Sequence, residues 1–182
     1  MTGTAAKMRG LAESIAPADW GVICPEGTYA HPTSGRAWWI REVGMEAVTS
    51  NDQIQRSMRS LEHSLPEGKL IVGGFSQGGA IASAMLETSI EERIVGLVLL
   101  ATMTVRSEYL RKILKSIRPR PLVWMHGERD HIVNISDGEE LVSIFENAGW
   151  SVIRLSHAKG HMVDLSQKNS LVEAIRMMSE ES

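Results

Sequence analysis

Cysteine is almost absent from this chain of 182 residues, which contains only Cys24. A single cysteine cannot form an intramolecular disulfide and cannot build a cysteine-rich zinc site. This usage suits a reducing compartment, so we expect a cytoplasmic protein. The N-terminal residues lack the apolar core of a signal peptide, and no stretch has the apolar length of a membrane span.

An excess of charge of one sign is also missing. The chain carries 19 Lys and Arg against 22 Asp and Glu, for a formal net charge of -3. This balance gives no electrostatic reason to expect nucleic-acid binding. Repeats, low-complexity tracts and Pro/Gly-rich linkers are absent as well, so we predict one domain over residues 1–182.

Short apolar runs alternate with longer amphipathic segments. The apolar runs predict strands at residues 20–24, 70–74, 94–100, 121–126 and 151–155. The amphipathic segments predict helices at residues 5–15, 46–65, 78–88, 107–117, 136–148 and 166–178. This alternation indicates an α/β fold with helices on both faces of a mainly parallel sheet, that is, a three-layer sandwich. Ligands of such sheets bind at the carboxyl ends of the strands.

The segment 70–82 predicts a strand, a tight turn and a helix, and Gly74-x-Ser76-x-Gly78 fits the nucleophile elbow in that context. Glycines are needed there because Cβ atoms beside the strained serine would collide with the strand and the helix. The backbone N–H of Gln77, at the helix N-terminus, is the expected oxyanion donor. The segment lacks the Gly-Lys-Ser/Thr ending of a phosphate loop. A glycine-rich turn with a solvated serine is the alternative, and Cys24, without an elbow after it, is the weaker nucleophile candidate.

A serine nucleophile needs a base and a group that orients the base, in the chain order Ser, Asp or Glu, His. Asp130 follows the strand at 121–126 and is favoured as the acid over Glu128 and Asp137. His161 follows the last strand, and Gly160 allows a tight loop, so we favour it as the base. His157 is the nearest competitor, and for it a structural hydrogen bond is the better interpretation.

Trp38 and Trp39 lie in the longest non-periodic segment, residues 25–43. Because that segment follows a predicted strand, it is expected at the ligand-binding edge of the sheet. The two side chains either line an apolar substrate pocket or cap the core beneath the loop, and the sequence leaves both open.

Four strings together resemble the phospholipase/carboxylesterase family, which includes the acyl-protein thioesterases. They are Gly-Phe-Ser-Gln-Gly-Gly at 74–79, His-Gly-Glu-Arg-Asp-His-Ile-Val at 126–133, Gly-His at 160–161 and Gly-Arg-Ala-Trp-Trp at 35–39. The resemblance implies an α/β-hydrolase with a Ser76–Asp130–His161 triad, no metal and no cofactor. It also implies hydrolysis of small-molecule carboxylic esters or thioesters through an acyl-enzyme. A homodimer is compatible with it.

The chain departs from that family at its start. The family opens with a strand ending in a Leu-His-Gly-type turn, which supplies the second oxyanion N–H, and this sequence begins after it. We therefore expect five to six strands without the N-terminal ones, and Met1 or Thr2 at the donor position. The strands at 20–24 and 70–74 would then pair directly, another segment would lie between them, or the true start would lie upstream. A catalytically weak or inactive binding protein on a hydrolase scaffold is the alternative function.

Overall fold

A computed structural model of the chain describes residues 4–40 and 47–180. The chain divides into two compact units, Met1–Glu67 and Gly68–Ser182, and each is described by itself. The single domain expected over residues 1–182 stays a prediction.

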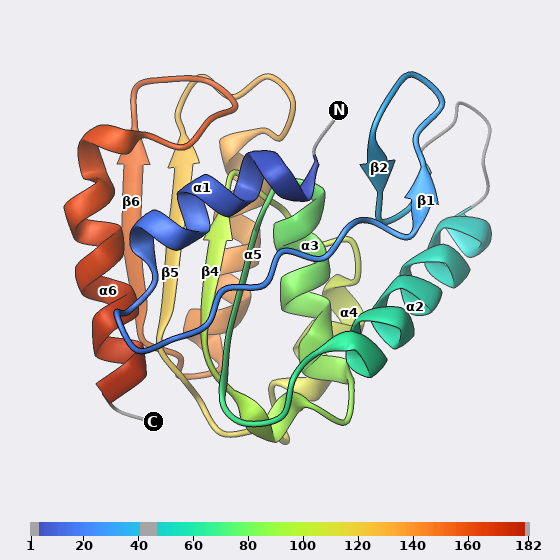
Figure 1. The fold of residues 1–182 in the computed structure, drawn as a ribbon, viewed down its shortest axis with the longest axis horizontal. Helices are drawn as coiled ribbons and strands as arrows, with labels where there is room; N and C mark the ends of the chain where they lie inside the picture. The colour runs from blue at the N-terminus through green and yellow to red at the C-terminus, as the bar shows by residue number, and fades with distance from the viewer. Residues whose placement is uncertain (1–3, 41–46, 181–182) are drawn as a thin grey trace. The chain divides into compact units, whose positions relative to one another are not determined.

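The second unit is built on a parallel sheet of four strands in the order β3-β4-β5-β6 (Figure 1). The strands are β3 (Leu70–Phe75), β4 (Ile94–Leu100), β5 (Leu122–Gly127) and β6 (Val152–His157). Each lies within two residues of a run predicted from the sequence. Every residue of β4 and β5 is buried, whereas β3, at one edge of this sheet, is mostly half-buried. The continuous apolar runs of β4 and β5 therefore match strands covered on both faces.

Helices cover both faces of this sheet. They are α3 (Gln77–Ala84), α4 (Ser107–Ile113), α5 (Ile135–Asn147) and α6 (Lys168–Glu180), with short 3-10 turns at Met85–Glu87, Glu91–Arg93 and Leu165–Gln167. A Cβ on Gly96 of β4 would lie 2.5 Å from the sulfur of Met178 on α6. Trp124 of β5 instead lies against Gly138 of α5. Trp124 pairs with Leu99, which has the opposite parity to Gly96, so α5 and α6 lie on opposite faces. This is the predicted three-layer α/β sandwich.

The first unit contains α1 (Ala5–Ile15), a short hairpin of β1 (Tyr29–Ala30) and β2 (Arg36–Ala37), and α2 (Ala47–Ser64). The hairpin falls in the segment that had no periodicity. Arg36 stabilises the base of the hairpin, because its Nε donates to the Gly27 carbonyl at 2.8 Å. Ser57 of α2 donates to the Trp38 carbonyl at 2.6 Å, which fixes the chain after the hairpin.

The strand predicted at residues 20–24 is wrong. That segment is irregular, and its residues alternate between half-buried and exposed. An apolar run indicates burial, but a strand also needs a hydrogen-bonded neighbour, and this segment is in no ladder of the described residues. Direct pairing of residues 20–24 with 70–74, one of the three alternatives that the sequence left open, is therefore not formed among the described residues, and the parallel sheet has four described strands rather than five to six. Met1 and Thr2 lie outside the described residues.

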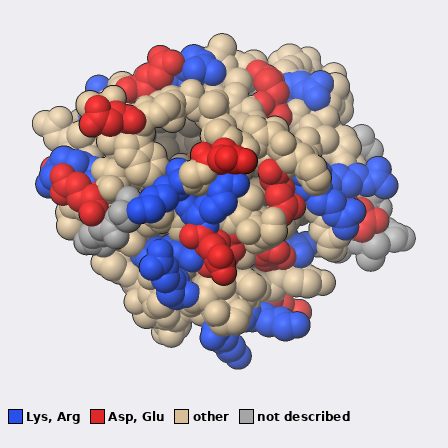
Figure 2. Space-filling model, turned by 60° about the horizontal axis from the view of Figure 1, so that its bottom comes forward, with Lys and Arg blue, Asp and Glu red and all other residues tan. Residues whose placement is uncertain are grey.

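Acidic and basic side chains are interspersed on the molecular face shown in Figure 2, as the nearly balanced composition predicts. Within the ranges that the structure describes, no helix combines the length and apolarity needed to cross a membrane.

Candidate active site

Ser76 occupies a strained turn between β3 and α3. Its φ of 55° and ψ of -120° place a non-glycine residue at positive φ, and the buried side chain is 5% exposed. Its N–H donates to the Leu100 carbonyl at 2.9 Å, which anchors the turn to the end of β4. Such strain persists only where the surrounding structure imposes it, and it collects at functional sites. The geometry is that of a nucleophile elbow.

Glycine at position 74 is required by close backbone contact. A Cβ there would lie 2.2 Å from the carbonyl carbon of Gly78 and 2.6 Å from the nitrogen of Gly79. The neighbouring atoms belong to the backbone of the first turn of α3, so no rotamer change relieves the contact. The glycine at 74 thus lets strand and helix meet behind Ser76, for the reason expected from the sequence.

Thr102 supports the elbow from the neighbouring strand end. Its Oγ1 donates to the Ser76 carbonyl at 2.7 Å, and its methyl carbon lies 2.6 Å from the position that a Cβ on Gly79 would take. Ala101, just before it, has a positive φ of 45° and is also buried. No motif in the sequence marks these two residues, although their place directly after β4 puts them at the carboxyl edge of the sheet.

Asp130 is buried in the turn after β5 and accepts three hydrogen bonds. The N–H groups of Ile132 and Val133 donate to Oδ1 at 2.8 and 2.9 Å. His161 Nδ1 donates to Oδ2 at 2.7 Å. Burial by itself would raise the pKa of Asp130, but the bonds from Val133, His161 and Ile132 outweigh it and hold that pKa below its usual range. Asp130 is therefore a carboxylate at neutral pH.

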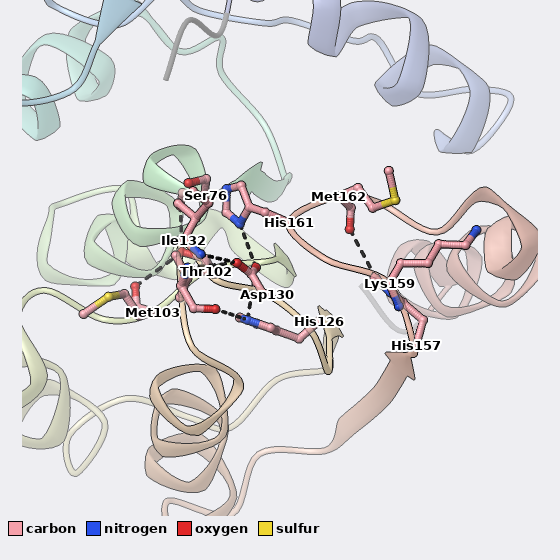
Figure 3. A network of polar contacts seen from close by, with 11 residues as sticks. Ser76, Thr102, Met103, His126, Asp130, Ile132, His157, Lys159, His161 and Met162 are labelled. Carbon is pink, nitrogen blue, oxygen red and sulfur yellow. Dashed lines mark hydrogen bonds and ion pairs between the residues drawn. The ribbon is translucent and has the colours of Figure 1, made fainter.

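His161 bonds to Asp130 through Nδ1, and its other ring nitrogen, Nε2, faces the elbow at Ser76. A carboxylate only accepts hydrogen bonds, so Nδ1 carries the hydrogen and Nε2 holds a lone pair in the neutral ring. Nε2 is buried and has no hydrogen-bond partner among the described residues. The ring lies 4.7 Å from that of Phe75, the residue before Ser76. Figure 3 shows His161 between Ser76 and Asp130.

His126 lies on the other side of Asp130. Its Nε2 is 3.0 Å from the Val133 carbonyl, to which it donates, and 3.5 Å from Asp130 Oδ2. The ring is fully buried and stacks on Trp124, with centroids 5.4 Å apart. From the sequence, His126 was predicted only as the end of a strand, yet its position four residues before Asp130 was a usable signal. It fixes the turn whose N–H groups bind Asp130.

The loop that carries His161 has its own supports. The His157 ring and the backbone of the turn after β5 are hydrogen-bonded to the first residues of this loop. Lys159 Nζ donates to the Asp164 carboxylate at 2.7 Å. The hydrogen bonds of Lys159 and Ser166 hold the pKa of Asp164 well below its usual range. The structural hydrogen bond expected for His157 is present, because its Nε2 lies 3.2 Å from the Met162 carbonyl.

The other predicted site residues divide between the two units. Gln77 is the first residue of α3, directly after Ser76. Trp39 is buried and Trp38 half-buried, both in the unit Met1–Glu67, so their role in a substrate pocket stays a prediction. Met1 and Thr2, the predicted second oxyanion donors, fall outside the described residues.

The competing candidates have other environments. Glu128 is exposed, and Asp137 lies in the first turn of α5. Cys24 is half-buried, and this burial raises the pKa of its thiol, although Arg9 acts in the opposite direction. A protonated thiol is a weak nucleophile. In the described ranges, no group of three or more His, Cys, Asp or Glu could hold a metal ion.

Comparison with known proteins gives sequence relatives and a structural relative. The chain is 26% identical over 170 residues to acyl-protein thioesterase 1 of Debaryomyces hansenii, covering 87% of this chain and 71% of that protein. It is 27% identical over 115 residues to the protein of that name from Cryptococcus neoformans var. neoformans (strain JEC21), covering 62% of this chain. That match spans 47% of the Cryptococcus protein, or about half its length.

The fold is shared with a solved structure, acyl-protein thioesterase 2 of Zea mays. The TM-score is 0.72 at 18% identity, over 97% of this chain and 89% of that one. At this identity the likeness concerns the fold. Family membership comes from a separate comparison, in which residues 5–171 match the family model described as "Serine hydrolase (FSH1)". Because the match covers most of the chain, this protein belongs to the FSH1 family of serine hydrolases.

Proposed function

We propose that this serine hydrolase cleaves carboxylic esters or thioesters through an acyl-enzyme on Ser76. The observation that carries the proposal is the orientation of His161. Its Nδ1 is bonded to a buried carboxylate, and its Nε2 has no described partner and lies on the side of the elbow. This arrangement gives the serine both the base and the orienting acid that it needs.

In the first half of the reaction, Ser76 Oγ attacks the acyl carbonyl carbon while His161 Nε2 takes the hydroxyl proton. The tetrahedral intermediate collapses when His161 returns that proton to the departing alkoxide or thiolate. An alcohol or thiol leaves, and the acyl group stays on Ser76 as an ester. Asp130, kept ionised by its hydrogen bonds, stabilises the imidazolium formed in between.

Water completes the cycle. His161 Nε2 removes a proton from the water molecule, which attacks the acyl ester, and then returns the proton to Ser76 Oγ. The acyl group departs as a carboxylic acid. In both halves of the reaction, the oxyanion of the tetrahedral intermediate is held by the N–H of Gln77. This residue lies in the first turn of α3, where N–H groups point toward the helix N-terminus. A second donor at Met1 or Thr2 stays a prediction from the sequence.

The substrate class is supported by the relatives, two of which are named acyl-protein thioesterase 1. Esters and thioesters pass through the same oxyanion and need no metal ion, which agrees with a site built from serine, histidine and aspartate. The substrate is therefore a small molecule or side chain bearing an acyl group. A cytoplasmic location and a homodimer are further predictions.

The test is hydrolysis of p-nitrophenyl acetate and of an S-acyl thioester by the wild type and by Ser76→Ala and His161→Ala. Triad deletions of this kind cost about 10⁶-fold in kcat, so both activities fall to the background of each variant's oxyanion site. Ser116→Ala is the matched control because its hydroxyl, in the exposed turn after α4, donates to the Ile113 carbonyl. Full activity in Ser76→Ala would refute the nucleophile, and a folded wild type with no turnover would favour the binding-protein alternative.

A further inference from the structure

His157, the last residue of β6, lies four residues before His161 and is buried at 6% exposure. Its ring makes two hydrogen bonds, both to the backbone of the loop that carries His161. The N–H of Lys159 donates to Nδ1 at 3.3 Å, and Nε2 lies 3.2 Å from the Met162 carbonyl. The ring therefore spans the loop from two residues before His161 to one residue after it (Figure 3).

These partners fix the tautomer of His157. A backbone N–H can only donate, so Nδ1 must be the acceptor and carry no hydrogen. A carbonyl can only accept, so Nε2 must carry the hydrogen. A neutral imidazole with its hydrogen on Nε2 satisfies both bonds. A protonated ring places a second donor opposite the Lys159 N–H and loses that bond.

The same loop is attached to the turn that carries Asp130. The N–H of Glu128 donates to the His157 carbonyl at 2.8 Å, and the N–H of Arg129 donates to the Lys159 carbonyl at 3.1 Å. Gly127 leaves room for this approach, since a Cβ there would lie 2.3 Å from the Gly160 carbonyl oxygen and 2.9 Å from Cε1 of His157. The ring and these bonds set the spacing between the two loops that His161 must bridge to reach Asp130.

We propose that His157 is a positioning residue, whose neutral Nε2–H ring holds the loop 159–162 so that His161 stays bonded to Asp130. The inference rests on the function proposed above, and it adds a second histidine on which activity depends. Loss of His161 removes the base directly, whereas loss of the His157 ring releases the loop that positions that base.

Other titratable groups lie on the same loops and on the neighbouring strand. The two loops and the neighbouring strand contribute the carboxylates of Glu128 and Asp164, the cations of Arg129 and Lys159, and the imidazoles of His126 and His161. Lys159 and Asp164 are paired with each other, so they add little net charge. The variants below change only the ring at position 157 and leave this surrounding charge in place.

The experiment compares His157→Ala, His157→Asn and His157→Gln with the wild type. An Asn oxygen can stand in for Nδ1 as acceptor, and a Gln amide for Nε2–H as donor, whereas Ala keeps neither bond. Because a displacement of about 1 Å in a catalytic group costs about 10²-fold, we expect kcat of His157→Ala to fall by about 10- to 100-fold with little change in KM. At least one of the amide variants recovers most of that loss.

Rescue by an amide separates positioning from a simple packing role, because Asn and Gln can restore one of the two hydrogen bonds and Ala cannot. His63→Gln, which removes an exposed histidine bonded to its own helix, keeps the wild-type kcat. Equal losses of kcat in His157→Ala and in both amide variants would contradict the proposal.

A readout without turnover keeps this test apart from that of the proposed function. The proton between His161 Nδ1 and Asp130 gives a downfield NMR signal in the wild type, which we expect to persist in the better amide variant and to be lost in His157→Ala. An unchanged signal in folded His157→Ala, or kcat within threefold of the wild type, would overturn the proposal. If the NMR signal behaves as expected while Ser76→Ala stays active, the positioning role stands and the proposed nucleophile fails.

Discussion

The two halves of the site are positioned by different means. Ser76 is held by backbone geometry, namely a φ of 55°, a close strand–helix contact at Gly74 and an anchoring bond to the Leu100 carbonyl. Asp130 and His161 are held mainly by hydrogen bonds to side chains and loop backbone. The first half depends on steric fit, which does not vary with pH. The second half depends on the ionised carboxylate of Asp130. Acid should therefore disturb the contact of the loop that carries His161 with Asp130 and leave the elbow at Ser76 in place.

The largest effect is expected from Gly74→Ala, which attacks the sterically fixed half. The added methyl would meet the backbone of Gly78, so strand and helix must separate. We expect the free energy of unfolding to fall by about 3 kcal/mol or more and esterase activity to be lost. Urea unfolding measures the change.

The matched control for that variant is Gly10→Ala in α1, where no heavy atom lies within 4 Å of the new Cβ. It should leave activity unchanged and stabilise the protein by about 0.5–1 kcal/mol. A folded, active Gly74→Ala would show that the elbow tolerates a wider separation than its geometry implies.

The next effect is expected from Asp130→Asn, which attacks the hydrogen-bonded half. The amide keeps an acceptor for the Ile132 and Val133 N–H groups but places the wrong partner opposite His161 Nδ1. We expect kcat to fall by about 10⁴-fold with the fold intact. Asp137→Asn, at the competing acid, should retain kcat within about threefold. Equal losses in the two variants would contradict the assignment of the acid.

A smaller effect is expected from Thr102→Val, which removes one bond from the back of the elbow. Loss of the bond to the Ser76 carbonyl should lower the free energy of unfolding by about 1 kcal/mol and reduce kcat several-fold. Thr88→Val loses a similar bond, to the Met85 carbonyl, away from the elbow. Thr88→Val should lose about as much free energy of unfolding as Thr102→Val and should keep the wild-type kcat. If both variants keep kcat, Thr102 supports only the fold.

The last prediction concerns how one stability difference changes with pH. The folded-state pKa of Asp130 lies below its unfolded value, so its contribution is fully present above about pH 4 and is lost as pH falls through the folded-state pKa. The difference in free energy of unfolding between the wild type and Asp130→Asn should therefore narrow below about pH 4. The corresponding difference for Ser116→Ala should stay constant. A gap that widens in acid would contradict the lowered pKa.

The sequence predicted those parts of the molecule that depend on local pattern. Strands β3 to β6 were predicted because their apolar runs lie between helical periodicities, and each motif residue follows one of those strands. The segment 20–24 failed because strand formation depends on a pairing partner, which periodicity does not report. The hairpin of β1 and β2 was missed because its strands have two residues each, too short for any alternation to register.

Two supporting residues of the site, Thr102 and His126, were missed for a related reason, and for His157 the sequence predicted a structural hydrogen bond but not its partner. All three act through contacts with residues distant in sequence or through a bond geometry that exists only in the folded loop. A sequence shows that a histidine follows a strand, but it does not show which ring nitrogen faces a carbonyl. The motif thus predicted the candidate triad, and the structure was needed to find what holds it.

The central claim is that Ser76 is the acylated residue and that His161 activates it. The most direct measurement is mass spectrometry of the protein after reaction with an alkyl fluorophosphonate, followed by peptide mapping. We predict one phosphonyl group per chain on Ser76, no adduct in Ser76→Ala and strongly slowed labelling in His161→Ala. An adduct on another residue, or equal labelling of Ser76→Ala, would contradict the account.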